Sequence, residues 1–153
     1  MSIFRVNLYN TFENIIKRKA FSAPSSTHRV YKDLSDLSKW ETLEKIKKGN
    51  LILLCRGIRF VWAIAHASDD CRITDVDAFR PAMKFEKNGF RFVSLDIYKE
   101  YASPLDGKKF FNNLVYEHPF EDPNFCVEIK PADGLEDAFN TAINKLLEDA
   151  ILS

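Results

Sequence analysis

The chain of 153 residues contains little of what a disulfide-bonded scaffold needs. Its three cysteines, Cys55, Cys71 and Cys126, are odd in number and have no paired spacing. This argues against a secreted disulfide framework and favours reduced thiols. Cys55 and Cys126 lie in the apolar runs LILLC and FCVEI, so they are predicted to act as small core hydrophobes.

Catalytic and metal-binding patterns are also missing from the sequence. The three histidines share no ligand spacing with the cysteines and are expected to be structural or solvated: His28, His66 and His118. There is no GxSxG nucleophile elbow and no glycine-rich phosphate loop. Asp75 and Asp77 would suit half of a carboxylate site, but a capped turn is the favoured interpretation. The sequence therefore predicts no enzymatic activity, no metal site and no cofactor.

Long hydrophobic runs are missing as well. No stretch approaches the roughly 18 consecutive apolar residues that a membrane-spanning helix requires. The opening segment MSIFRVNLYN lacks the charged, apolar and cleavage-site regions of a signal peptide. These observations predict a cytoplasmic protein.

Net charge is zero, because 22 basic residues balance 22 acidic ones. This balance weakens the case for strong non-specific nucleic-acid binding, which depends on neutralising phosphates. The charges are nevertheless unevenly distributed, since acids dominate from Glu117 onward. One early segment carries basic residues and no acid: Lys17, Arg18, Lys19, Arg29 and Lys32. A local basic face remains compatible with nucleic acid.

Aromatic residues are abundant, with 13 Phe, five Tyr and two Trp. Some must build the core, and the rest provide flat surfaces for a flat ligand. At least one of Phe60 and Trp62 is expected in the core, because they alternate with Val61 along a predicted strand. Phe21 and Phe79 fall in predicted loops, where an aromatic residue either covers the core or belongs to a site. Periodicity alone leaves these two alternatives open.

The first half of the chain predicts strands and helices in alternation. SIFRVNL alternates like a half-buried strand, and Asn10 with Glu13 resembles a capping box that starts a helix through Lys19. A second helix is predicted from Asp33 to Lys48, ending at Gly49. The apolar runs LILLC and IRFVWAIAHA then predict a central hairpin.

The second half predicts further strands and a final helix. Residues 69–88 appear irregular, whereas 90–98 and the segment FCVEI are strand-like. A capping box at 133–136 opens a helix whose core-facing residues are Leu135, Phe139, Ile143, Leu146 and Ala150. Residues 1–153 are therefore expected to form one α+β domain, with a curled mixed or antiparallel sheet and flanking helices.

Several of these segments resemble, in order, the YTH domain and its relative the EVE domain, both of the PUA-like superfamily. The resembling segments are IFRVNLYNTFENI, FSAPSSTHRVYKDL, NLILLCRGIRFVWAIAHAS and GFRFVSLDIYKEYASPLDGKKF. The resemblance implies a PUA-like open barrel with a C-terminal helix. YTH domains read 6-methyladenine in RNA through an aromatic cage, and related domains of McrB-like restriction systems read modified bases in DNA. By resemblance, the chain is a non-catalytic reader of a methylated or hydroxymethylated base flipped into an aromatic pocket.

Position by position, the resemblance implies two sets of ligand-binding residues. The base-binding pocket would contain Tyr9, Glu13, Phe21, Ser22, Trp62 and Phe79. Phosphates would meet Lys17, Arg18, Lys19, Arg29, Lys32, Arg80 and Lys84. Phe replaces the family Trp at both cage positions, which gives a smaller stacking surface and departs from the 6-methyladenine cage.

The expected partner is nucleic acid carrying a modified base. DNA is favoured over RNA, because a chain of this size with little basic surplus fits the specificity domain of a larger restriction or defence protein. Two alternatives from other classes stay open. One is a protein-interaction module, of an inhibitor or immunity type, with exposed aromatics as anchors. The other is a nucleic-acid hydrolase built on Asp75 and Asp77.

Overall fold

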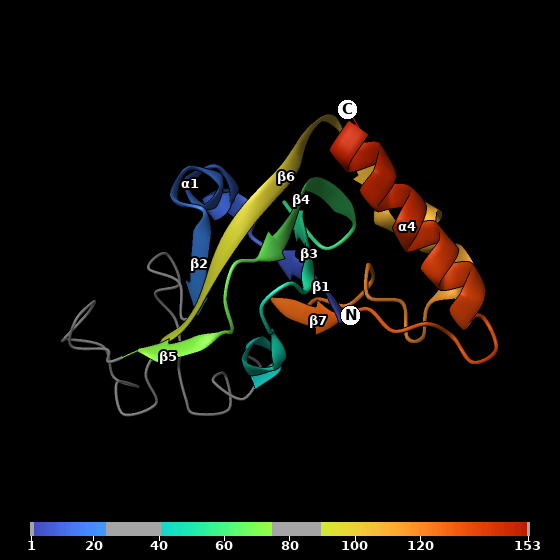
Figure 1. Cartoon of the computed structure of the whole chain (residues 1–153), viewed down its shortest axis with the longest axis horizontal. Helices are drawn as coiled ribbons and strands as arrows, with labels where there is room; N and C mark the ends of the chain where they lie inside the picture. The colour runs from blue at the N-terminus through green and yellow to red at the C-terminus, as the bar shows by residue number, and fades with distance from the viewer. Residues whose placement is uncertain (1, 24–40, 75–89, 153) are drawn as a thin grey trace.

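A computed structural model describes residues 2–23, 41–74 and 90–152 (Figure 1). Its strands are β1 (Ile3–Asn7), β2 (Ala20–Ala23), β3 (Leu51–Cys55), β4 (Phe60–Ala67), β5 (Arg72–Thr74), β6 (Phe90–Asp106) and β7 (Cys126–Glu128). Its α-helices are α1 (Phe12–Arg18), α3 (Gly107–Phe111) and α4 (Glu136–Leu152). Short 3-10 helices are η1 (Tyr9–Thr11), η2 (Glu41–Lys45) and η5 (Asn112–Leu114).

The strands form one curled, mixed sheet in the order β2-β6-β4-β3-β1-β7, and β5 pairs with β6 beside this path (Figure 1). β1 is parallel to β3, whereas the other described pairs are antiparallel. The long strand β6 pairs with β2 and β5 near its start and with β4 further on, across two register shifts. Such irregularities bend and twist a strand, which curls the sheet. The predicted α+β class, with a curled sheet and a C-terminal helix, is confirmed.

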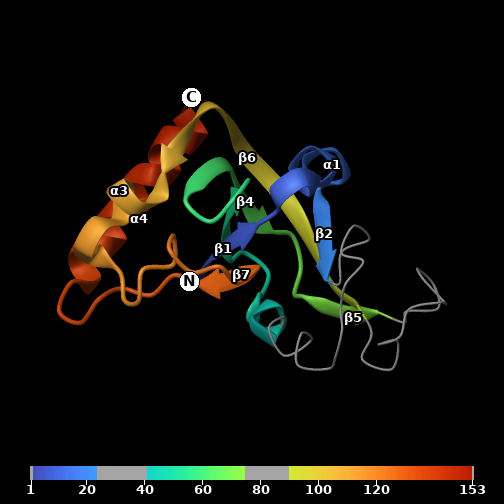
Figure 2. The ribbon, with the colours of Figure 1, turned by 180° about the vertical axis from the view of Figure 1, so that it is seen from behind.

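The two faces of the sheet carry separate apolar cores. The face covered by α1, called the α1 face, has a core that includes Phe4, Phe12, Phe21, Ile52 and Leu54. The face covered by α3 and α4, called the α4 face, has a core that includes Leu53, Phe111, Phe120, Phe139 and Ile143. Figures 1 and 2 show α1 and α4 on opposite sides of the sheet, and Figure 2 shows α3 alongside α4.

β1 is more deeply buried than its alternating sequence predicts. All five of its residues are buried, because β1 lies between β3 and β7 and both of its faces are covered. Arg5 is fully buried, and its guanidinium donates to the carbonyl oxygens of Ile58 (3.3 Å), Asp122 (3.0 Å) and Asn124. Backbone acceptors thus satisfy most of the charged group inside the protein, which is what burying a charge requires. The prediction of a half-buried strand is wrong for this reason.

The central hairpin and the last helix follow the sequence closely. β3 and β4 pair antiparallel, with Leu51 opposite His66. Of the five residues predicted to face the core, Phe139, Ile143, Leu146 and Ala150 are buried in α4, whereas Leu135 precedes the helix and is partly buried. These two predictions are confirmed.

The first helix is confirmed, but not its predicted capping box. α1 begins at Phe12 after Thr11, whose side chain makes no capping bond and instead donates to the Leu8 carbonyl at 2.6 Å. The helix ends at Lys19, whose left-handed φ of 55° stops it. A 3-10 turn at η1 displaces the helix start, so Asn10 and Glu13 do not form the predicted cap.

Other segments depart from prediction or lie partly outside the described residues. Of the predicted helix over 33–48, residues 33–40 lie outside, and the described end is the 3-10 helix η2 followed by Gly49 at φ 87°. β6 continues past Tyr98 to Asp106, because β4 keeps pairing with it up to the contact of Phe60 with Asp106. Pairing between distant strands, which periodicity does not report, set this length.

Candidate functional site

The turn between β1 and α1 presents Tyr9 to solvent. Tyr9 has a φ of 44°, and 52% of it is exposed. Positive φ is uncommon for a non-glycine residue and costs backbone energy, so the surrounding structure must hold it there. The Tyr9 N–H donates to the buried Asn7 side chain at 3.4 Å, and the preceding Leu8 N–H donates to the Cys55 carbonyl at 2.8 Å. Tyr9 therefore lies beside the end of β3, where Arg56 follows.

Arg56 connects this turn to the central hairpin. Its guanidinium carbon lies 4.6 Å from the ring centre of Phe12 and 4.9 Å from that of Trp62. Its Nη2 lies 3.3 Å from a carboxylate oxygen of Glu13, which is 81% exposed. A cation over an aromatic face is attracted by the ring quadrupole. One arginine thus joins two rings and one acid from α1 and β4.

The structure joins two residues of the predicted base pocket through Arg56. Glu13 and Trp62 both contact Arg56, with Trp62 partly buried against the core of the α1 face, and Tyr9 lies in the turn beside the end of β3. Arg56 itself was not among the predicted site residues. The only sequence signal was an arginine next to Gly57 at the hairpin tip, and its acidic partner Glu13 lies 43 residues away.

Phe21 differs from its prediction as a loop aromatic. It lies in β2 opposite Val93, only 2% of it is exposed, and its ring meets Phe125 edge-on with centres 6.1 Å apart. Pairing of β2 with β6 draws this residue into the core, which the polar sequence around it does not indicate. Ser22 follows in the same strand, with its backbone opposite Phe92.

Basic residues gather at the end of α1. Lys17 and Arg18 occupy its last turn, Lys19 caps it, and all three are exposed. Cations are favoured at a helix C-terminus because they oppose its negative dipole end. The remaining predicted site residues lie outside the described residues: Arg29, Lys32, Phe79, Arg80 and Lys84. Asp75 and Asp77, the acids of the alternative hydrolase, lie outside them as well.

Several pKa values reflect local surroundings. Burial raises the pKa of the Cys55 thiol to about 12, and burial also raises the pKa of Cys126 and of Cys71. Cys55 and Cys126 are buried and unbridged, as predicted for core hydrophobes. Hydrogen bonds from Arg59 lower the pKa of Asp106 to about 2. The buried thiols are therefore protonated and unsuited to nucleophilic chemistry at neutral pH.

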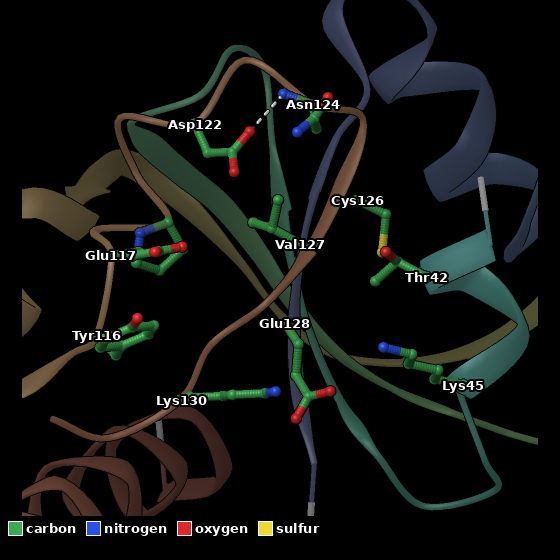
Figure 3. A pocket seen from close by; sticks show the side chains of 11 residues that line it. Thr42, Lys45, Tyr116, Glu117, Asp122, Asn124, Cys126, Val127, Glu128 and Lys130 are labelled. Carbon is green, nitrogen blue, oxygen red and sulfur yellow. Dashed lines mark hydrogen bonds between the residues drawn. The ribbon is translucent and has the colours of Figure 1, made fainter. Parts of the chain in front are cut away.

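A cavity of about 500 Å³ lies elsewhere, along β7 at the edge of the sheet (Figure 3). Thr42 and Lys45 flank one side of β7, and Tyr116 and Glu117 the other (Figure 3). Other residues that line the cavity include Asp122, Asn124, Glu128 and Lys130. Among the residues that the structure describes, no predicted pocket residue lines it, and its charges are of both signs. This cavity is separate from the cluster around Arg56.

Two properties concern only the part of the chain that the structure describes. Within these residues, no group of three or more His, Cys, Asp or Glu side chains is placed to hold a metal ion. Among the helices in the same ranges, none has the length and apolar character needed to cross a membrane.

Comparison with known proteins identifies the fold and no more. No protein-family model matches the sequence, and no curated protein matches it. Twelve chains of solved structures are similar, and one is described as the crystal structure of the MmI1 YTH domain. That chain superposes with a TM-score of 0.50 at 10% identity, over 97% of this chain and 99% of the other. The fold is therefore YTH-like along nearly the whole length.

Proposed function

We propose that this chain is a non-catalytic nucleic-acid-binding module that recognises a modified base. One observation carries the proposal: Arg56 bridges Phe12, Glu13 and Trp62 beside the exposed Tyr9, next to a basic helix end, on a YTH-like fold. Flat rings, a carboxylate and cations are the groups that a flipped base and its phosphates need.

Each group has a role in this proposal. The base leaves its stack and lies against Trp62 and Tyr9, with Phe79 assigned as a further ring. The carboxylate of Glu13 accepts a hydrogen bond from an amino group on the base edge, while Arg56 holds that carboxylate in place. Phe21 supports the pocket from the core. The Ser22 backbone offers hydrogen bonds at the same end of β2.

Phosphates are bound by the basic end of α1. Lys17, Arg18 and Lys19 are exposed and next to the cluster in sequence. Arg29, Lys32, Arg80 and Lys84 extend this basic set. Because phosphate contacts position a nucleic acid without reading its sequence, replacing the three α1 residues should weaken modified and unmodified oligonucleotides alike.

DNA is the favoured nucleic acid, and the module would serve as the single-domain specificity unit of a restriction or defence system. The net charge of zero suits a reader that depends on a larger protein for overall affinity. The family resemblance supports modified-base reading in general, and it supplies no catalytic group.

A binding panel tests the proposal. Short DNA and RNA oligonucleotides, each unmodified, methylated or hydroxymethylated at one base, are titrated at one fixed salt concentration. Binding is followed by polarisation of a labelled oligonucleotide and by Trp fluorescence, since Trp62 would contact the base. We expect at least one modified oligonucleotide to bind about tenfold tighter than its unmodified match, a difference of about 1.4 kcal/mol.

Equal affinities for modified and unmodified oligonucleotides would refute the proposal. Tyr116→Ala is the matched control for Trp62→Ala, the variant that removes a ring from the proposed pocket, because Tyr116 is an exposed aromatic that lines the separate cavity along β7. It should bind like the wild type. A loss of binding in this variant, with Trp62→Ala unaffected, would instead place the nucleic acid along β7.

A further inference from the structure

Strand β7 ends the sheet within the described residues, because β1 pairs with it on one side only. In an antiparallel pair, alternate residues turn their backbone N–H and C=O groups toward the partner strand and away from it. The Phe125 carbonyl accepts the Asn7 N–H at 2.8 Å, so Phe125 and each second residue after it face β1. Cys126 and Glu128 therefore direct their backbone groups outward, as a template for a further strand.

A neighbouring strand begins beside this edge and then breaks off. The Tyr116 N–H donates to the outward carbonyl of Lys130 at 2.9 Å, next to an antiparallel bridge. At Glu117 the backbone takes a φ of 40°, which an extended strand does not allow. Within the residues that the structure describes, no backbone group then pairs with the outward groups of Cys126 and Glu128.

The cavity of about 500 Å³ lies along this unpaired edge. It is lined by Cys126, Val127 and Glu128 of β7, and by Tyr116 and Glu117, where the neighbouring line of chain ends (Figure 3). Its volume falls within the roughly 300–1,000 Å³ that is usual for binding pockets. Because residues flank β7 on both sides, the cavity fits one extended segment better than the sheet edge of a second copy of this chain (Figure 3).

The wall that carries Thr42 and Lys45 is anchored to the sheet. Both residues belong to η2, whose Leu43 is fully buried. Glu44 of the same turn accepts two hydrogen bonds from the Arg91 guanidinium, at 3.0 Å from Nε and at 2.8 Å from Nη2. This wall is therefore held in place by contacts that a ligand does not need to form.

The loop before β7 is also held from inside the protein. The fully buried Arg5 donates to the carbonyl oxygens of Asp122, at 3.0 Å, and of Asn124, and both residues line the cavity. A binding site whose parts are already fixed loses little conformational entropy when its ligand arrives. The buried charge of Arg5 thus stabilises one end of the cavity.

The charges along the cavity differ between its two ends. Figure 3 shows Glu128 between Lys45 and Lys130 at one end and Asp122 at the other. With Glu117, three acids face two lysines in the lining. Nucleic acid needs an excess of cations to neutralise its phosphates, so this lining disfavours it. The two ends instead complement a peptide that has an acidic side chain near the lysines and a basic one near Asp122.

We propose that the outer edge of β7 binds an extended peptide of a partner protein, which joins the sheet as an antiparallel strand. Its backbone pairs with Cys126 and Glu128 and continues the line that Tyr116 begins. Its acidic end lies near Lys45 and its basic end lies toward the loop before β7. This peptide site is separate from the proposed base pocket and does not depend on it.

A designed peptide tests the proposal. The probe is the acetylated and amidated heptapeptide Glu-Thr-Val-Thr-Val-Thr-Arg, whose acidic end comes first because the added strand is antiparallel. Two isomers carry N-methyl groups, one at the third and fifth residues and the other at the fourth and sixth. Only one of these sets faces β7, so we expect one isomer to bind about tenfold more weakly than the other. The backbone amide NMR signals of Cys126 and Glu128 should shift on binding.

A charge exchange tests the orientation of the peptide. Lys45→Glu should weaken the probe about two- to fivefold and should strengthen a probe whose glutamate is replaced by lysine. Lys47→Glu is the matched control, because Lys47 is exposed, carries the same charge and does not line the cavity. It should leave both affinities unchanged. Equal effects of the two variants would overturn the assigned orientation and charge contacts.

The remaining outcomes each decide against the peptide site. Absence of probe binding, equal affinity of the two N-methyl isomers, or NMR shifts away from β7 would overturn it. A mass that doubles with concentration in sedimentation, and is lost in Lys45→Glu, would assign the edge to a second copy of the chain. Shifts of Cys126 and Glu128 with an oligonucleotide and not with the probe would assign it to nucleic acid. Because the probes carry no base, none of these results bears on discrimination of modified bases.

Discussion

The two faces of the sheet close their cores in different ways. On the α4 face, apolar groups complete the packing: the rings of Phe111 and Phe120 stack with centres 5.3 Å apart, and Phe139 lies 6.0 Å from Phe111. On the α1 face, the edge of the core is finished by a cation, since Arg56 lies over both Phe12 and Trp62. The core of the α4 face is thus completed by apolar rings, whereas the core of the α1 face is covered at its edge by a charged side chain that is 39% exposed.

The difference indicates where stability and where binding reside. A ring enclosed by other rings contributes to folding, because its whole surface leaves water. A ring covered by an exposed guanidinium retains a face that a planar ligand can occupy, and the guanidinium can turn to a phosphate. We therefore expect substitutions on the α4 face to change stability alone, and substitutions at the edge of the α1 face to change binding.

The largest expected effect comes from the buried rings. Phe139→Ala should lower the free energy of unfolding by about 3–5 kcal/mol, because it removes a ring and leaves a cavity in the α4-face core. Urea denaturation measures this loss. The protein that remains folded should keep its oligonucleotide affinity, since no binding group is touched.

Phe21→Ala is the matched substitution on the α1 face. Phe21 is as deeply buried as Phe139, so a loss of stability of similar size, about 3–5 kcal/mol, is expected. In contrast to Phe139→Ala, it should also reduce discrimination of the modified base. If the two variants lose equal stability and both keep discrimination, the pocket does not reach Phe21.

A smaller effect is expected from Arg56→Ala. Exposed ion pairs and cation–π contacts each contribute about 1 kcal/mol or less, so the free energy of unfolding should change little. Affinity for the modified oligonucleotide should fall about tenfold, or about 1.4 kcal/mol, because the guanidinium that holds the Glu13 carboxylate toward the base is lost. Isothermal titration alongside urea denaturation gives both quantities.

Lys99→Ala is the control for that prediction. Lys99 also places a cation over a ring, 5.3 Å from the centre of Tyr101, and its removal changes net charge by the same amount. It should leave affinity unchanged. Equal losses in the two variants would mean that net charge, and not the position of Arg56, determines binding.

The smallest effect is expected from the acid titration of Asp106, whose carboxylate joins Arg59 of the β3–β4 turn to the start of α3. Arg59 lowers the pKa of this carboxyl from 3.8 to about 2. Because the folded pKa lies below the unfolded one, the stabilisation is present above about pH 4 and is lost as pH falls through 2. Carbon-detected NMR of the carboxyl should show a midpoint near 2 in the wild type. Arg59→Ala should move it up toward 3.8. A wild-type titration midpoint close to 3.8 would contradict the hydrogen bonds between Arg59 and Asp106.

The sequence by itself determined the elements whose signals are local. The stripe from Phe139 to Ala150 predicted α4 and its buried side, since residues three or four apart share one face of a helix. The apolar runs before and after Arg56 predicted the central hairpin, because short apolar runs separated by a turn are typical of paired buried strands. The α+β class and the reduced, buried state of Cys55 and Cys126 also followed from such patterns.

Only the tertiary structure decided what depends on distant partners. It buried Arg5 by surrounding it with carbonyl groups more than 50 residues away, and it drew Phe21 into a strand through pairing with β6. It also placed Arg56 between the rings of Phe12 and Trp62. Periodicity reports the direction of a side chain within its own element, whereas charge satisfaction and strand pairing are set by groups that meet only when the chain has folded.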